Sequence, residues 1–231
     1  MDKTIAFLRE VPFFANLETE ELEKVASLLI TRKYDRGTNV FLEGGEGDEF
    51  YLIQSGVVKI YKESETREII LALFGEGDFF GEMAVLENEQ TRSASAMIME
   101  QSVLYVLKRK DFIWVMNQNP QIAIKIMYTA LERLRASNEL IKDLTFRDAR
   151  KRIANGLYRL VEKHGLKSGS GVLIDLKLTH QQIADMSGTV RETVTKFMLD
   201  LQSQSLIRIE KKKIFIYNIE KFKQLLGEES I

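Results

Sequence analysis

The sequence predicts an α+β protein with an N-terminal β-roll (jelly-roll), a long central helix and a C-terminal winged helix-turn-helix. Short strands broken by glycines between residues 34 and 108 predict the β-roll. An apolar seam at coiled-coil spacing predicts the long helix, and two short helices joined at a glycine predict the helix-turn-helix. We place the domains at residues 1–118 (sensor domain), 119–146 (dimerisation helix) and 147–231 (winged helix-turn-helix).

The composition is that of a globular protein with two domains. The chain has 231 residues, of which 45% are hydrophobic and 29% are charged. It has no apolar run long enough for a membrane span and no signal-peptide pattern, so we expect a cytoplasmic protein with no membrane partner. The absence of cysteine excludes disulfides, thiolate-bound metals and Cys-ligated iron–sulfur clusters.

Charge is distributed unevenly along the chain. Residues 1–118 contain 13 Lys and Arg against 21 Asp and Glu, whereas residues 147–231 contain 16 against 10. Because the change of sign coincides with a change of structural pattern, random scatter explains it poorly. The asymmetry indicates that the rear half of the chain meets a polyanion.

The front half begins with two expected helices, at residues 3–11 and 19–30, before the strands start. Each expected strand ends in glycine or a charged turn, which is typical of a jelly-roll or small barrel. Four glycines are expected to be turn residues with unusual φ and no direct chemistry. These are Gly45, Gly47, Gly56 and Gly77.

The stretch Phe80–Ala96, F-G-E-M-A-V-L-E-N-E-Q-T-R-S-A-S-A, contains the groups that a nucleotide requires. Arg92 offers a multi-donor cation, Ser93 offers a hydroxyl, and the Gly81–Ala84 backbone offers N–H groups to a phosphate. Glu82 would repel a phosphate but can accept hydrogen bonds from a ribose. Spacing alone supports equally well a surface Arg–Glu ion pair of small energetic value.

This run closely resembles the phosphate-binding cassette of the cyclic-nucleotide-binding domain in the CRP/FNR family of bacterial transcription regulators. In that family the Gly-Glu pair contacts the ribose and the Arg-Ser pair contacts the cyclic phosphate. The resemblance implies cyclic AMP as the effector and RNA polymerase as a further partner. It implies ligand contacts at Gly81, Glu82, Met83, Ala84, Arg92 and Ser93.

From about Pro120 to Phe146 the pattern is one long helix with an apolar seam, which predicts a parallel homodimer. A helix packed on its own domain would need a wider apolar stripe. The seam runs in steps of four or three residues through Ala123, Met127, Leu131, Leu134, Asn138 and Ile141.

A polar residue inside this seam needs a partner, because burial of an unpaired amide costs free energy. Asn138 could serve only to fix the coiled-coil register. In the family, two adjacent polar residues of this helix meet the adenine, one from each subunit, and the resemblance places Ser137 and Asn138 there. The family pattern is Thr-Ser, so the base preference stays open.

Residues 166–171 are expected to form a Gly/Ser turn before a strand pair, and the helix-turn-helix follows. Thr179 is a natural N-cap for a helix to Met186, Gly188 can take φ > 0 in the turn, and a second helix starts near Val190. An ordinary αα-hairpin is the alternative. The run R-E-T-V disfavours it, because it closely resembles the recognition helix of the CRP family.

Residues at the start of a recognition helix reach base edges. Arg191 can contact guanine and Glu192 can accept from cytosine N4, while Lys196, where the family usually has Arg, reaches a guanine or a phosphate. Contacts to the DNA backbone are expected at Thr179, His180, Thr193 and, in the lysine-rich turn of a closing hairpin, Lys212. The resemblance implies double-stranded DNA with an inverted repeat whose half-site is like TGTGA.

The sequence therefore predicts an effector-responsive, sequence-specific DNA-binding regulator, switched by cyclic AMP. The alternative is the same DNA-binding regulator with a vestigial pocket, protein control or a non-nucleotide effector. No nucleophile lies beside a base and no metal-ligand cluster is found, so neither an enzyme nor a metal is expected. Haem is not expected either, because His164 and His180 both lie in the basic half. We also expect Arg92→Ala to weaken effector binding while hardly changing thermal stability.

Overall fold

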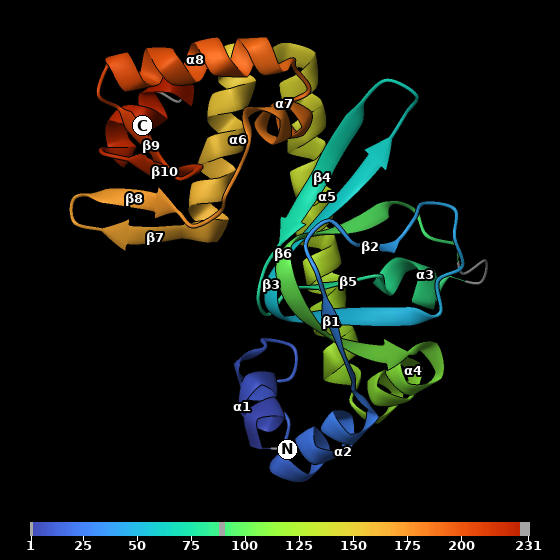
Figure 1. Cartoon of the computed structure of the whole chain (residues 1–231). Coiled ribbons are helices and arrows are strands. Elements are labelled where there is room, and N and C mark those ends of the chain that lie inside the picture. Colours follow the sequence, from blue (N-terminus) through green and yellow to red (C-terminus); the bar gives the residue numbers. More distant parts are fainter. Residues whose placement is uncertain (1, 88–90, 227–231) are drawn as a thin grey trace. The chain divides into compact units, whose positions relative to one another are not determined.

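The computed structural model describes residues 2–87 and 91–226, and the chain divides into two compact units. The first contains the residues up to Ser64 and Ile70–Ala136; the second contains Glu65–Ile69 and the residues from Ser137 onward. Figure 1 shows the elements of both units. Residues 88–90 of the cassette stretch and residues 227–231 lie outside the described part. The three-part division expected from the sequence remains a prediction.

The front of the chain forms an antiparallel β-roll flanked by short helices, as the sequence predicts (Figure 1). Its six-stranded sheet has the order β1-β6-β3-β4, with β2 paired to β6 and β5 paired to β3. The elements up to residue 118 are α1 (Asp2–Glu10), α2 (Thr19–Leu28), β1 (Ile30–Tyr34), β2 (Asn39–Phe41), β3 (Glu49–Glu63), β4 (Glu68–Phe74), β5 (Phe79–Phe80), α3 (Glu82–Leu86), β6 (Ser95–Lys108) and α4 (Arg109–Gln118).

Side-chain alternation along β3 builds two separate cores in this unit. Phe50 and Leu52 point into a cluster shared with the helices, where the Phe50 and Phe112 rings stack at 4.2 Å. Tyr51 and Ile53 point to the opposite face, into a second cluster inside the roll. The same alternation therefore carries Tyr51 toward the candidate ligand site.

Helix α5 (Pro120–Phe146) has one buried and one exposed face. It starts at proline, which is favourable at a first helical position. Ile122 and Ile126 are buried in the first unit's core. The seam residues are exposed instead, namely Ala123, Met127, Leu131, Leu134, Asn138 and Ile141. Leu134 and Ile141 are 56% and 61% exposed, so a large apolar strip faces away from the chain's own core.

The second unit contains a winged helix-turn-helix. A four-stranded sheet has the order β7-β8-β10-β9, and α7 and α8 form the helix pair (Figure 1). Within the described residues the elements after α5 are α6 (Ala149–His164), β7 (Gly165–Ser168), β8 (Gly171–Ile174), α7 (His180–Ser187), α8 (Arg191–Ser203), β9 (Ile207–Glu210), β10 (Lys213–Ile216), α9 (Ile219–Lys223) and the 3₁₀ helix η1 (Gln224–Leu226).

The expected turn at residues 166–171 is wrong for most of its length. Leu166 pairs with Leu173 and Ser168 pairs with Gly171, so this segment is strand β7 of a hairpin. The turn shrinks to two residues because Gly169, with φ of +59°, reverses the chain at once.

A buried carboxylate fixes the end of α5 to α6. Asp143 is 2% exposed. Arg147 Nε lies 2.8 Å from its Oδ1, Arg159 Nη1 donates to Oδ2 at 2.9 Å, and Asn155 Nδ2 donates to Oδ1 at 3.0 Å. Because a buried carboxylate is tolerated only when its charge and hydrogen bonds are satisfied, this set of partners holds the second half of α5 in place.

Candidate functional site

The cassette begins at a glycine that no other residue can replace. Gly81 follows β5 with φ of +83° and caps the short helix α3. A Cβ added there would lie 2.8 Å from Arg92 Nη1 and 3.0 Å from the carbonyl oxygen of Glu49. Both the left-handed backbone and the close approach of Arg92 therefore require glycine.

Arg92 lies inside the wall of the first unit rather than on its surface. Its side chain is 4% exposed. Nη1 donates to the carbonyl of Gly81 at 3.0 Å, and Nη2 donates to the carbonyl of Glu49 at 2.9 Å. The guanidinium lies 4.1 Å from the centre of the Phe41 ring. Burial lowers the pKa of Arg92, although a guanidinium stays charged at physiological pH.

Two further features show that the hydrogen-bonding capacity of this guanidinium is partly unused among the described residues. Arg92 Nε is buried and has no hydrogen-bond partner among the described residues. A guanidinium has five N–H groups, and within the described part of the chain two hydrogen bonds to carbonyls are observed. The remaining donors suit a planar or tetrahedral oxyanion that can accept more than one hydrogen bond.

Gly47 packs against Arg92, contrary to the expectation that it is only a turn residue. Its φ is not positive, but a Cβ there would lie 2.3 Å from Ala84 Cβ and 2.8 Å from Arg92 Nε. Gly56 and Gly77 have positive φ as expected, whereas at the first turn Gly44, not Gly45, is left-handed. Gly47 thus preserves the space that Arg92 and α3 occupy.

The carboxylate of Glu82 is paired with Arg133 of α5. Glu82 Oε1 lies 3.0 Å from Arg133 Nη1, and Arg133 Nη2 donates to the carbonyl of Phe79 at 2.6 Å. The Glu82 side chain is 12% exposed. This finding overturns the alternative of a surface Arg92–Glu82 pair. Sequence reasoning missed Arg133, although its spacing of 7 and 11 from the buried Ile126 and Ile122 places it on the same helix face.

A second carboxylate supports Arg92 from behind, and sequence reasoning missed it too. Glu49 accepts hydrogen bonds from the hydroxyl of Tyr51 at 2.7 Å and from Arg32 at 2.6 and 2.7 Å, and Lys108 Nζ lies 2.6 Å away. Burial would raise the pKa of Glu49, but the hydrogen bonds from Arg32, Lys108 and Tyr51 outweigh it and lower the pKa to about 2. The carbonyl that receives Arg92 Nη2 therefore belongs to a firmly anchored residue.

The remaining predicted ligand residues divide between the two units. Ser93 is exposed, and its hydroxyl lies 3.6 Å from the sulfur of Met83, itself 50% exposed. The structure thus gathers six of the predicted residues around one site, namely Gly81, Glu82, Met83, Ala84, Arg92 and Ser93. Ser137 and Asn138 are exposed on α5 and belong to the second unit. The assignment of all eight residues to a ligand remains a prediction.

In the second unit, the predicted helix-turn-helix is built by caps at its two ends. The hydroxyl of Thr179 accepts from Gln182 N, so Thr179 is the N-cap of α7 as predicted. Gly188 ends α7 with φ of +58°. Arg152 donates to the carbonyls of Ser187 and Gly188, both at 2.9 Å, which fixes the turn that leads into α8.

Helix α8 presents its predicted base-reading residues to solvent. Arg191, Glu192 and Lys196 are exposed, while Thr193 is half-buried. Val194, Met198 and Leu201 on the other face are buried in the unit's core. Because the side chains of Arg191, Glu192 and Lys196 are exposed, their charged groups are accessible to a binding partner.

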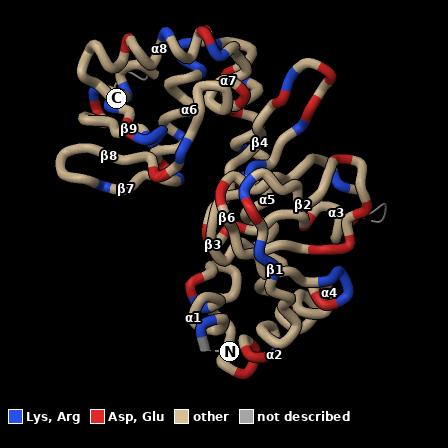
Figure 2. The backbone as a smooth tube through the Cα atoms, viewed as in Figure 1, with Lys and Arg blue, Asp and Glu red and all other residues tan. Residues whose placement is uncertain are grey.

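The wing turn carries two lysines in a strained backbone. Lys211 and Lys212 have φ of +48° and +67°, between the paired residues Glu210 and Lys213. This is the φ pattern of a type I′ hairpin, which normally uses Asn or Gly. The carbonyl of Lys212 accepts from Leu178 N at 3.0 Å, so the wing turn is attached just ahead of α7. Figure 2 shows Lys and Arg positions in blue near the β9 label.

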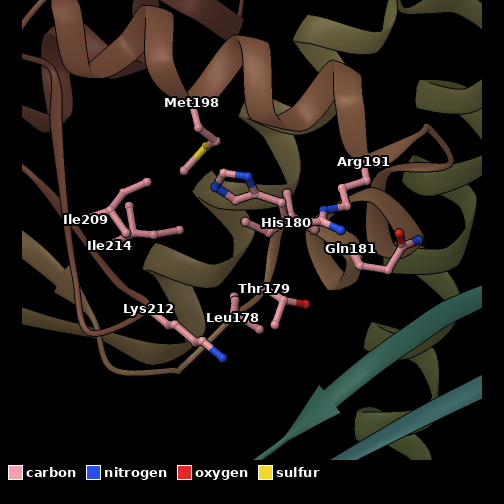
Figure 3. A pocket seen from close by; sticks show the side chains of 10 residues that line it. Leu178, Thr179, His180, Gln181, Arg191, Met198, Ile209, Lys212 and Ile214 are labelled. Carbon is pink, nitrogen blue, oxygen red and sulfur yellow. The ribbon is translucent and has the colours of Figure 1, made fainter.

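A cavity of about 480 Å³ lies between the start of α7, α8 and the wing. Figure 3 shows its side chains, with the His180 ring inside and Arg191 and Lys212 at its sides. Its buried apolar walls are Leu178, Ile183, Met198 and Ile214. The cavity brings together four residues predicted to contact DNA, namely Thr179, His180, Arg191 and Lys212.

Comparison with known proteins assigns both units to families. Residues 31–119 match the model of the cyclic nucleotide-binding domain, and residues 151–225 match that of the Crp-like helix-turn-helix domain. The chain is 33% identical to the cyclic AMP receptor protein of Thermus thermophilus over 86% of this chain and 88% of that protein. The chain belongs to the CRP/FNR family of transcription regulators.

A second relative supports the assignment over nearly the whole chain, and a solved structure shares the fold. A CRP-like cAMP-activated global transcriptional regulator of Mycobacterium tuberculosis is 30% identical over 96% of this chain and 97% of that protein. The structure of the c-di-GMP responsive global regulator CLP of Xanthomonas campestris shares the fold, with a TM-score of 0.74 and 24% identity over 87% of this chain and 100% of that one.

The CRP/FNR chain is therefore a DNA-binding transcription regulator that carries a cyclic nucleotide-binding domain, which confirms the predicted fold class and family. Its relatives belong to a class of proteins that regulate transcription rather than catalyse reactions. Among the described residues no group of His, Cys, Asp and Glu could hold a metal ion, and none of their helices is long and apolar enough to cross a membrane.

Proposed function

We propose that the protein is a homodimeric regulator that binds cyclic AMP at the Arg92 site and an inverted-repeat operator through α8. The observation that carries the proposal is the buried Arg92 guanidinium, whose Nε has no hydrogen-bond partner among residues 2–87 and 91–226. Burial of a cation with unused donors costs free energy in the absence of a ligand. A cyclic phosphate supplies the missing charge and acceptors.

The groups around Arg92 match the other parts of the nucleotide. The carboxylate of Glu82, already aligned by Arg133, can accept from the ribose 2′-hydroxyl while keeping its ion pair. The exposed hydroxyl of Ser93 and the backbone of Met83 and Ala84 face the same phosphate. Ser137 and the partner subunit's Asn138 supply the hydrogen bonds to the base.

Dimerisation follows from the exposed strip on α5. Met127, Leu131, Leu134 and Ile141 are between 43% and 61% exposed and recur at coiled-coil spacing. Burial of such a strip against a second copy removes apolar surface from water at about 25 cal/mol per Å². A parallel pair also places two recognition helices about one helical turn of DNA apart, as an inverted repeat requires.

The exposed start of α8 specifies the operator. Arg191 contacts a guanine, Glu192 accepts from a cytosine N4, and Lys196 reaches an inner guanine or a phosphate. The half-site is like TGTGA. Its inner positions can differ from this sequence, because Lys196 stands where the family usually has Arg. Thr179, His180, Thr193 and Lys212 contact the backbone. The regulator acts in the cytoplasm, contacts RNA polymerase and turns over no substrate.

Two experiments test the two halves of this proposal. Calorimetry of the purified protein with cyclic AMP, cyclic GMP and c-di-GMP should show cyclic AMP as the preferred ligand, with one site per chain. Selection from a random duplex library should enrich a two-fold symmetric TGTGA-like motif. An enriched motif without symmetry would contradict the proposed dimer on DNA.

The same DNA-binding function with another effector, or none, is the second candidate. The c-di-GMP responsive regulator that shares the fold supports it, and so do the departures from the family pattern at Ser137 and Asn138. The calorimetric panel separates the two candidates. Binding of c-di-GMP alone, or of no nucleotide, would favour the second.

A further inference from the structure

The cavity beside the recognition helix has the charge of an anion site. It is lined by ten described residues, and none of them has a carboxylate. Two cationic residues line the cavity together with His180, namely Arg191 from α8, whose charge acts on His180, and Lys212 from the wing. Thr179 and Gln181 also line the cavity, but the Thr179 hydroxyl donates to Gln182 Oε1 and Gln181 Nε2 donates to Asp185 Oδ1, so both are already engaged within α7 and its cap. An anion that enters therefore meets two cationic residues, the His180 ring and apolar walls.

The hydrogen bonds of His180 fix which ring nitrogen can take up a proton. Thr195 Oγ1 donates its single proton to the carbonyl of Arg191 at 3.0 Å. Its 2.8 Å contact with His180 Nδ1 is therefore one in which Nδ1–H donates and the hydroxyl oxygen accepts. In the neutral imidazole the lone pair then lies on Nε2, which is the atom that gains a proton.

The surroundings disfavour protonation of this imidazole while the cavity holds no anion. Burial lowers the pKa of His180, and the positive charge of Arg191 lowers it further. A phosphate nearby offsets the effect of Arg191, because its negative charge screens Arg191 and favours the imidazolium. Binding of an anion in the cavity and protonation of His180 should therefore favour each other.

Resting on the proposed DNA binding, we propose that the cavity takes one phosphate of the DNA backbone and that His180 gains a proton at Nε2 when it does. The phosphodiester oxygen accepts the new Nε2–H hydrogen bond between Arg191 and Lys212. Operator affinity is then lowest above the pKa of His180 in the complex. It rises as the pH falls toward the lower pKa of the free protein and is constant below that.

The test is the operator affinity of the full-length protein, measured by fluorescence anisotropy at constant ionic strength from about pH 5.5 to about pH 8.5. The probe is a duplex with the TGTGA inverted repeat. Affinity should rise by about tenfold per half-site for each unit by which DNA raises the pKa of His180. His180→Gln should remove this dependence, and His180→Arg should bind with pH-independent affinity because its charge is permanent.

The sequence offers a matched control, since His164 is the only other histidine and the chain has no cysteine. His164→Gln should keep the pH dependence of the unmodified protein. A dependence that survives in His180→Gln, or disappears in His164→Gln, would overturn the inference. Tight binding that is indifferent to pH would overturn the inference alone, whereas a lack of sequence-selective binding at every pH would overturn the proposed function with it.

Discussion

The two candidate sites hold their arginines in opposite ways. Arg92 is 4% exposed and donates to two carbonyls, whereas Arg191 is exposed on α8. A small ligand must be enclosed, so the residues that bind it also form the wall of the unit. A DNA groove is read from outside, so the residues that read it need not support the fold. Substitution of the buried Arg92 should therefore affect stability and binding together, whereas substitution of the exposed Arg191 should affect binding alone.

The largest effect is expected at the exposed strip of α5, which resembles α8 in exposure but not in polarity. Leu134→Glu would place like charges face to face across the seam and should give monomers. Because each half-site is then bound alone, operator affinity should fall by about 100-fold or more. Sedimentation and anisotropy measure the two effects. Glu132→Gln is the control, because Glu132 is exposed on the same helix but lies outside the seam. If Leu134→Glu is still a dimer, this face of α5 is not the dimer interface.

Arg92→Gln should lower both effector affinity and stability. The phosphate loses its charged partner, at a cost of about 2–5 kcal/mol in binding. The fold loses two buried hydrogen bonds to carbonyls, at a cost of about 1–3 kcal/mol in unfolding. The structure thus replaces the earlier expectation of little change in stability, since burial of Arg92 was not visible in the sequence.

Ser93→Ala is the matched control at the same site, because Ser93 is exposed and its hydroxyl supports no buried group. It should weaken the binding of cyclic AMP by about 1 kcal/mol and keep the unfolding free energy within about 0.5 kcal/mol of the unmodified protein. Calorimetry and urea unfolding give both numbers. Equal stability of Arg92→Gln and Ser93→Ala would show that the comparison between buried and exposed sites is mistaken.

Glu49→Gln should destabilise the first unit without direct contact to a ligand. The folded pKa of Glu49 is about 2, below its ordinary value of 4.5, so its carboxylate contributes about 3 kcal/mol above pH 4.5. That contribution is lost as the pH falls toward 2. Urea unfolding should show that the difference in unfolding free energy between the unmodified protein and Glu49→Gln is large at neutral pH and becomes smaller as the pH falls. If this difference in unfolding free energy does not change with pH, the destabilisation comes from packing and not from the charge of Glu49.

Arg191→Ala should have the smallest effect on the unfolding free energy and a moderate effect on operator affinity. It should cost about 1–3 kcal/mol per half-site, relax the preference at one guanine and leave stability within about 0.5 kcal/mol. Lys212→Gln should instead weaken all duplexes alike and lower the salt slope by about one. A selected motif that is the same with and without Arg191 would remove the base-reading assignment of α8.

The parts that the sequence predicted are those that local rules determine. Thr179 and Gly188 set the helix-turn-helix because an N-cap hydroxyl and a left-handed glycine act within a few residues. The heptad spacing likewise predicted the exposed face of α5.

The parts that the sequence did not predict depend on tertiary contacts. Arg133 reaches Glu82 across 51 residues, and the carbonyl of Glu49 meets Arg92 across 43. Gly47 has an ordinary φ and is required only because Ala84 and Arg92 pack against it. None of these contacts leaves a signal in local spacing, apart from the helical face that Arg133 shares with Ile122 and Ile126.

The central claim is that a nucleotide at Arg92 controls DNA binding at Arg191. The direct test is the affinity for the TGTGA inverted repeat, measured at one fixed salt concentration with and without saturating cyclic AMP. Cyclic AMP should raise the affinity by about 5- to 150-fold in the unmodified protein and have no effect in Arg92→Gln. Equal operator affinity with and without cyclic AMP, in a protein that calorimetry shows to bind it, would contradict the account.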